Sequence, residues 1–168
     1  ALKQRRNLNI NGLGALDLRT HKPDGSTWNF NLRKDRQLAR QLIDETDPDW
    51  VIGSPPCTAF SLWNRGINYK KMNPKDVAPK LEEGRLHLDF TASVYREQLR
   101  HGRHFLHEHP AQATSWCTEE VKRIMDLENV DRSVAHQCQY GAQHEGHPIK
   151  KPTGFMSNSI EVRKALSK

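Results

Sequence analysis

The sequence predicts an α/β fold with a mainly parallel sheet. Three observations lead to this prediction: short apolar runs typical of strands, longer stretches with apolar residues on one helical face, and the alternation of the two along the chain. The 168 residues suit one domain, long enough to bury a real core. Because such sheets place their sites at the carboxyl ends of strands, we expect functional side chains there.

The first third of the chain predicts two strands and one helix. Residues 14–18 read as a short buried strand with an acid, Asp17, near its end. Residues 32–46 have apolar side chains on one helical face, which predicts a helix. Residues 50–52 predict the next buried strand, and a sharp turn through residues 53–57 follows it.

The rest of the chain continues the alternation. We expect a long loop at residues 64–79, because that stretch is rich in glycine, proline and lysine. A helix over residues 80–101 follows, and Gly102 ends it. The remaining predicted elements are a strand at residues 103–108, a helix at 118–127, strands at 133–139 and 153–156, and a last helix opened by a capping box of Asn158 and Glu161.

Charge and cysteine content suggest the partner and the compartment. The net charge of +6 and the pI near 9.4 favour an anionic partner such as nucleic acid. Three scattered cysteines without a paired framework favour a reducing compartment, so we expect the nucleus or a bacterial or phage-host cytoplasm. With no long apolar run, no membrane partner is expected. The abrupt start at Ala1 suggests a fragment or an excised domain.

The first chemical motif is Ser54-Pro55-Pro56-Cys57, followed shortly by Phe60-Ser61. This order resembles the nucleophile loop of the cytosine-5 DNA methyltransferases, which implies that Cys57 is a nucleophile. Carbon 5 of cytosine reacts poorly until a thiolate adds at carbon 6 and turns the ring into an enamine-like donor. The alternative is a small cysteine packed in a proline-rich turn.

The second motif is His107-Glu108-His109-Pro110, at the end of a predicted strand. It resembles the methyltransferase segment in which a strand delivers a Glu followed by Asn and then Val or Pro. The resemblance implies that Glu108 holds and protonates N3 of cytosine. His109 stands where the family has Asn. The alternative is a surface glutamate beside polar histidines.

A third segment, residues 137–141 with residues 150–155, is similar to the region after the Glu strand in compact methyltransferase-like proteins of phages and mobile elements. The resemblance covers residues 14–165. It implies a Rossmann-like methyltransferase sheet with helices on both faces, without the first strand and the target-recognition domain. It also implies DNA as the partner, with contacts from Ser61, Arg65, Lys150 and Lys151.

The resemblance further implies S-adenosylmethionine as the methyl donor. The family binds it with a glycine-rich loop after the first strand, whereas Gly12-Leu13-Gly14 precedes a predicted strand. The loop is therefore expected upstream of Ala1 or has been lost. Asp17, Ser54 and Pro55 are the candidate cofactor-binding residues.

Two other readings remain open. A metal site would draw on His101, His104, His107 and His109 with Cys117 and Cys138, but their spacing matches no firm metal motif and no ligand is assigned. The second reading is a catalytically inactive, methyltransferase-like module of a mobile element that only binds nucleic acid.

Overall fold

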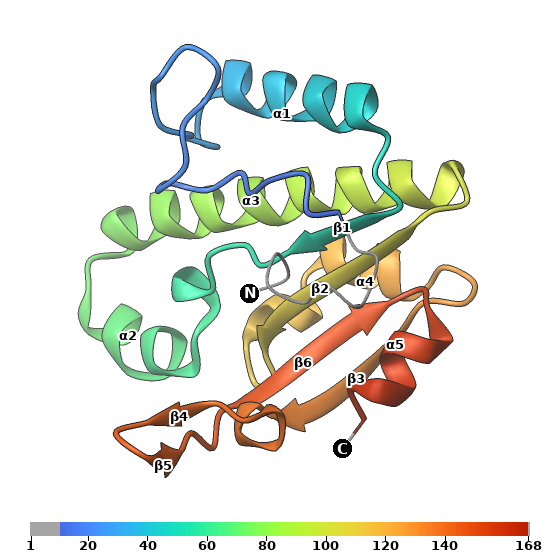
Figure 1. Ribbon diagram of the computed structural model, residues 1–168. Coiled ribbons are helices and arrows are strands. Elements are labelled where there is room, and N and C mark those ends of the chain that lie inside the picture. Colours follow the sequence, from blue (N-terminus) through green and yellow to red (C-terminus); the bar gives the residue numbers. More distant parts are fainter. Residues whose placement is uncertain (1–10, 168) are drawn as a thin grey trace. The chain divides into compact units, whose positions relative to one another are not determined.

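The computed structural model describes residues 11–167, and the chain divides into two compact units, Ala1–Pro48 and Asp49–Lys168. Within residues 11–48, the first unit contains one helix, α1 (Arg33–Thr46), which confirms the helix expected at residues 32–46. The second unit contains the sheet and the remaining helices (Figure 1).

In the first unit, the strand expected at residues 14–18 is wrong, because these residues form no strand. Asp17 closes a turn instead: its Oδ1 accepts from the backbone N of Arg19 at 2.7 Å, and its carbonyl accepts from Thr20 N at 3.1 Å. A short apolar run becomes a strand only where a neighbouring strand can satisfy its backbone, and residues 14–18 pair with none.

A buried ion pair holds the loop of the first unit to α1. Lys22 Nζ lies 2.9 Å from Asp35 Oδ1, and the backbone N of Asn29 donates to Asp35 Oδ2 at 2.7 Å. These two contacts hold the pKa of Asp35 below its ordinary value, the Lys22 hydrogen bond contributing most. Trp28 is buried in this unit as well.

The second unit is built on a mixed four-stranded sheet in the order β1-β2-β6-β3. The strands are β1 (Trp50–Gly53), β2 (His104–Pro110), β3 (Asp131–His136) and β6 (Pro152–Ser157). β1 and β2 are parallel, and β6 is antiparallel to both β2 and β3. Three strands therefore run in one direction, and the fourth runs against them between β2 and β3.

The expectation of a mainly parallel sheet is thus corrected at β6. Two adjacent parallel strands need a crossover of a dozen or more residues, usually a helix. Between β3 and β6 the chain forms only a 3₁₀ turn (Gln137–Tyr140) and a small hairpin of β4 (Gln143–His144) and β5 (His147–Pro148). Without a crossover helix the chain returns antiparallel, and the fold is α/β in the broader, mixed sense.

Helices cover both faces of the sheet, as expected. α3 (Pro74–Arg100) and α4 (Glu119–Met125) lie behind it in Figure 1, and the short α5 (Ile160–Ala165) lies in front. The main core forms under α3 and α4, where Tyr95 stacks on Phe105 with ring centroids 4.3 Å apart. This core consists of Ala59, Phe60, Leu88, Ala92, Tyr95, Phe105, Ala113, Trp116, Val121, Ile124, Val130 and Met156.

The loop expected at residues 64–79 is largely helical, which corrects the sequence-based prediction. A π-helical turn (Asn64–Asn68) and the short α2 (Tyr69–Lys71) precede α3. α3 begins at Pro74, where a proline costs no hydrogen bond, and the side chain of Asn73 caps it by accepting from Lys75 N at 2.9 Å. Of the residues that suggested a loop, Pro74 starts α3, Pro79 lies inside α3 and Gly66 lies in the π-helical turn.

The last helix is also capped differently from the prediction. Ser159, not Asn158, is the N-cap, and its Oγ accepts from Val162 N at 3.3 Å. Asn158 instead bonds the backbone at the start of β2, accepting from Phe105 N and donating to the carbonyl of Arg103. The side chain thereby anchors the end of β6 to the neighbouring strand.

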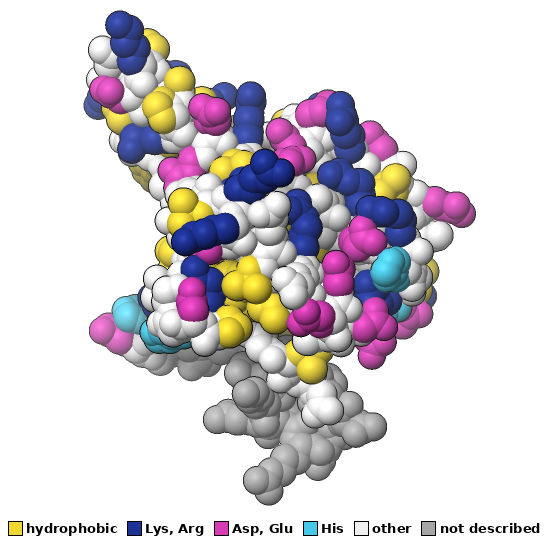
Figure 2. Space-filling view, turned by 90° about the horizontal axis from the view of Figure 1, so that it is seen from above, with side chains coloured by type: hydrophobic (Ala, Val, Ile, Leu, Met, Phe, Trp, Pro, Cys, Tyr) yellow, Lys and Arg dark blue, Asp and Glu magenta, His cyan; other side chains and the backbone are white. Residues whose placement is uncertain are grey.

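The charge on the surface and the polarity of the helices relate to two expectations, a nucleic-acid partner and no membrane partner. In Figure 2, Lys and Arg side chains alternate with Asp and Glu over the visible face, so the positive charge does not form one continuous patch there. Within residues 11–167, every helix is too short or too polar to cross a membrane.

Gly84 marks a close contact between α3 and the segment that follows Cys57. A Cβ at Gly84 would lie 2.8 Å from Ala59 Cβ and 2.9 Å from Phe60 Cε2. We expect Gly84→Ala to lower the free energy of unfolding by about 1–3 kcal/mol through overpacking, although alanine is the better helix former. Urea unfolding checks this, with Gly66→Ala as the control because a Cβ there meets nothing within 4 Å. Equal stability of the two variants would contradict the tight contact.

Candidate functional site

The two chemical motifs meet at the carboxyl edge of the sheet. β1 and β2 are parallel with Gly53 opposite His107, so the residues after β1 reach the end of β2. There Ser54 Oγ donates a hydrogen bond to Glu108 Oε2 at 2.6 Å, across 54 residues of sequence. The loop that carries Cys57 and the expected acid are therefore neighbours.

Alternation along β2 separates the acid from the histidines. Phe105, His107 and His109 are buried under α3, while Glu108 points to the other face and is half-buried. Glu108 Oε1 is shielded from solvent and has no hydrogen-bond partner among the described residues. Ser54 thus holds one oxygen of the carboxyl group, and the other oxygen is buried without a partner among the described residues.

Cys57 is half-buried rather than enclosed, which argues against a purely packed cysteine. It precedes a short 3₁₀ turn (Thr58–Phe60), and its carbonyl accepts from Phe60 N at 2.9 Å. Ala59 and Phe60 are buried in the main core and anchor the loop directly after the thiol. All three cysteines are free, so Cys117 and Cys138 provide references for the reactivity of Cys57.

A buried histidine pair, His107 and His109, lies beneath the site. The sequence predicts that the two share one face of the strand, but it did not predict their burial. Tyr95 Oη lies 3.0 Å from His107 Nδ1, and the ring centroids of His107 and His109 are 5.4 Å apart. Tyr95 Oη also occupies the space that a Cβ at Gly53 would need, so the last residue of β1 has to be glycine. The signal available in the sequence was the alternation of His107 and His109 about an acid.

Burial keeps the His107 imidazole neutral. Desolvation, with a smaller effect of His109, lowers the pKa of His107 to about 3. The unfolded chain has an ordinary histidine pKa near 6.5 and binds a proton more readily, so stability falls as the pH drops from about 6.5 towards 3.

We expect His107 to contribute about 2 kcal/mol of stability loss between pH 7 and pH 5. Urea unfolding at both pH values measures this, and His107→Phe should reduce the difference by a similar amount. The exposed His147 provides the control, since His147→Phe should leave the pH dependence unchanged. An unchanged pH dependence in His107→Phe would show that this histidine is not buried in its neutral form.

Of the residues expected to contact nucleic acid, Ser61 and Arg65 follow Cys57 closely in the sequence. Ser61 is half-buried and its Oγ accepts from Asn64 N at 3.2 Å, while Arg65 is exposed in the π-helical turn. Trp63 beside it is 75% exposed, an unusual position for an aromatic side chain. Residues 54–75 contain four Lys and Arg residues and no Asp or Glu, so this segment can approach phosphate without local repulsion.

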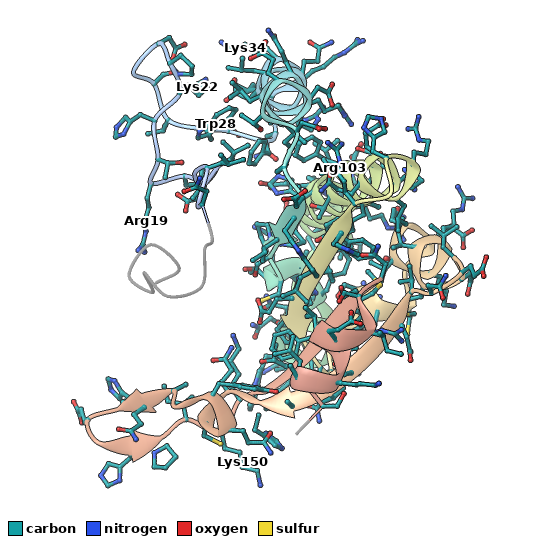
Figure 3. All side chains as sticks on the ribbon, turned by 45° about the vertical axis from the view of Figure 1, so that its right-hand side comes forward. Arg19, Lys22, Trp28, Lys34, Arg103 and Lys150 are labelled. Carbon is teal, nitrogen blue, oxygen red and sulfur yellow. The ribbon has the colours of Figure 1, made fainter. Side chains whose placement is uncertain are left out.

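Lys150 and Lys151 are exposed where the hairpin returns to the sheet. Figure 3 shows the hairpin extending away from the sheet, with Lys150 at its base. The next residue, Pro152, pairs with His136 at the carboxyl end of β3, and Thr153 pairs with Pro110. The two lysines therefore lie at the same edge of the sheet as Glu108.

Each of the candidate cofactor residues already has a hydrogen-bond partner within its own unit. Asp17 uses its carboxylate to close a turn in the first unit, Ser54 donates to Glu108, and the Pro55 carbonyl is bound by His109. Gly12 and Gly14 belong to an exposed, irregular segment that follows no described strand. S-adenosylmethionine would have to displace these hydrogen bonds in order to contact the three residues.

The structure does not support the metal reading. Among the described residues, no three His, Cys, Asp or Glu side chains form a group that could hold a metal ion. Both nitrogens of His109 have hydrogen-bond partners, and Nδ1 of His107 faces Tyr95.

No known family model, curated protein or solved structure matches this chain. The relation to cytosine-5 methyltransferases therefore stays a prediction that rests on the motifs.

Proposed function

We propose that this domain engages a cytosine flipped out of DNA in the manner of the cytosine-5 DNA methyltransferases, with Cys57 as nucleophile and Glu108 as the N3-binding acid. The observation that carries the proposal is the hydrogen bond from Ser54 Oγ to Glu108 Oε2. It joins two motifs that the sequence predicts to serve one reaction.

The sheet gives further support. Parallel strands with one antiparallel strand inserted beside the last of them, as in β1-β2-β6-β3, resemble part of a Rossmann-like methyltransferase sheet. In such α/β sheets ligands bind beyond the carboxyl ends of the strands. The Cys57 loop, Glu108 and Lys151 all lie at that edge.

The chemistry on the base uses residues of this chain. The Cys57 thiolate adds to carbon 6 of cytosine and forms a carbon–sulfur bond, while the ring electrons move towards N3. Glu108 supplies the proton at N3, so no anionic ring accumulates. With the proton on N3, carbon 5 becomes an enamine-like donor. The addition reverses when Glu108 takes the proton back from N3 and the carbon–sulfur bond breaks, which restores the aromatic ring and the Cys57 thiolate.

Binding of DNA has to offset the cost of flipping. Extruding a base costs a few kcal/mol of stacking and pairing. The exposed Trp63 offers an aromatic surface to neighbouring bases, and Arg65, Lys150 and Lys151 offer charge to phosphate. These residues support DNA as the partner.

A second candidate is a domain that holds DNA without methylating it. The hydrogen bonds that already engage the candidate cofactor residues Ser54 and Pro55 favour it. Titration calorimetry with S-adenosylmethionine, followed by methyl transfer to cytosine-containing duplex, separates the two. Cofactor binding with methylated cytosine supports the methyltransferase. DNA binding without cofactor binding supports the second candidate, and absence of DNA binding would overturn both.

A further inference from the structure

We propose that His109 is a positioning residue that fixes the Cys57 loop through the carbonyl of Pro55. The evidence is a buried chain of contacts: His109 Nε2 lies 3.1 Å from Pro55 O, and His109 Nδ1 lies 2.5 Å from Ser115 Oγ. The link to cytosine chemistry rests on the proposed function, whereas the link to the Cys57 loop rests on the geometry alone.

The contacts determine the tautomer of the ring. A carbonyl oxygen can only accept, so His109 Nε2 has to carry the hydrogen that bonds Pro55. In the neutral ring Nδ1 then has no hydrogen, and it accepts from the hydroxyl of Ser115. Burial lowers the pKa of His109, which favours this neutral form. Ser115 is fully buried, so its hydroxyl has no competing water.

His109 is one of two anchors on opposite faces of β2. Ser54 bonds Glu108 on one face, and Pro55 bonds His109 on the other. Consecutive residues of the loop are thus held by consecutive residues of the strand. A loop fixed at one point can swing about it, whereas two anchors set its direction and hence the position of Cys57 relative to Glu108.

The tautomer provides the first test, on the whole chain. Nitrogen NMR of the histidine rings should show His109 with the hydrogen on Nε2 and Nδ1 as an acceptor. Ser115→Ala, which removes the partner of Nδ1, assigns the signal by shifting it. A ring with its hydrogen on Nδ1 would overturn the proposal, since the bond to Pro55 could not form.

Alkylation of Cys57 provides the second test and does not depend on methyltransferase activity. His109→Ala should raise the rate of iodoacetamide alkylation at Cys57 about tenfold, the effect of losing one net hydrogen bond. Cys117 and Cys138 are internal references and should change less than about twofold. His109→Gln, whose amide offers both a donor and an acceptor, should restore the rate to near that of the unaltered chain.

General unfolding would accelerate all three thiols together. In that event the other two variants decide. The proposal is supported if alkylation of Cys57 alone is faster in Ser115→Ala and if its rate is normal in His109→Gln. Equal Cys57 rates in all folded variants overturn it.

The third test connects positioning to cytosine. The duplex carries 5-fluorocytosine, in which fluorine replaces the hydrogen on carbon 5 and cannot leave as a proton. With S-adenosylmethionine supplied, the unaltered chain should form a covalent complex with this duplex. His109→Ala should form it about tenfold more slowly, opposite in direction to its faster alkylation. If the unaltered chain forms no complex, the proposed function fails. The tautomer and alkylation results still test whether His109 positions the Cys57 loop. Normal complex formation by a folded His109→Ala would overturn the positioning role.

Discussion

Replacing Cys57 by serine should abolish the covalent complex with 5-fluorocytosine DNA and reduce methyl transfer at least about a thousandfold, a barrier increase of about 4 kcal/mol. The hydroxyl of serine is almost entirely protonated at neutral pH, whereas a free thiol near pKa 8.5 is a few per cent ionised and intrinsically nucleophilic. Denaturing gel electrophoresis of the protein–DNA mixture measures the complex, and tritium transfer measures turnover.

The other two cysteines offer matched controls for this experiment. Cys117→Ser and Cys138→Ser make the same atomic change at free thiols outside the Ser54–Glu108 site, and both should retain the complex. Binding of unmodified DNA should persist in Cys57→Ser, since phosphate contacts dominate affinity. A covalent complex of normal yield in Cys57→Ser would exclude this residue as the nucleophile.

Glu108→Gln should slow methyl transfer about 10²- to 10⁴-fold, the usual contribution of a positioned proton donor. The glutamine keeps the shape of the side chain, and its amide oxygen still accepts from Ser54, so the anchor of the loop survives. The effect is therefore expected in kcat, with little change in DNA affinity. Single-turnover kinetics with saturating DNA measure it.

Ser54→Ala separates the acid from its anchor. This variant keeps the carboxyl group but removes its only hydrogen bond from the loop, so we expect a smaller loss, about tenfold. Glu119→Gln, at an exposed position on α4, should behave like the unaltered chain. Glu108→Gln at full rate would remove the acid from the proposed chemistry.

Local periodicity predicted much of the fold. α1, β1, β2 and α4 lie close to where the sequence placed them, because each has its own apolar pattern or a clear end signal. The start of α3 was missed because proline at a first helical turn has the same sequence signal as proline in a loop. The direction of β6 was missed because it depends on the connection between β3 and β6. The apolar pattern of β6 itself contains no information about that connection.

The candidate site could also be predicted only in part. Sequence motifs selected Cys57 and Glu108, and the structure brings the loop of the first to the side chain of the second. The bond between His109 and Pro55 was beyond prediction, since it joins residues 54 positions apart and depends on a tautomer set by Ser115. Asp17 was misplaced for a simpler reason: a short apolar run ending in an acid also describes a turn.

The contacts of Gly53 and Gly84 with their neighbours bear on how the domain can be re-engineered. One helix, α3, contacts the chain on both sides of Cys57: Tyr95 lies against Gly53 before it, and Gly84 lies against the side chains of Ala59 and Phe60 after it. Neither glycine has room for an added methyl group. A mutant library aimed at new base preferences should therefore keep both codons fixed. Diversity belongs in residues 62–68, which contain exposed side chains such as Trp63.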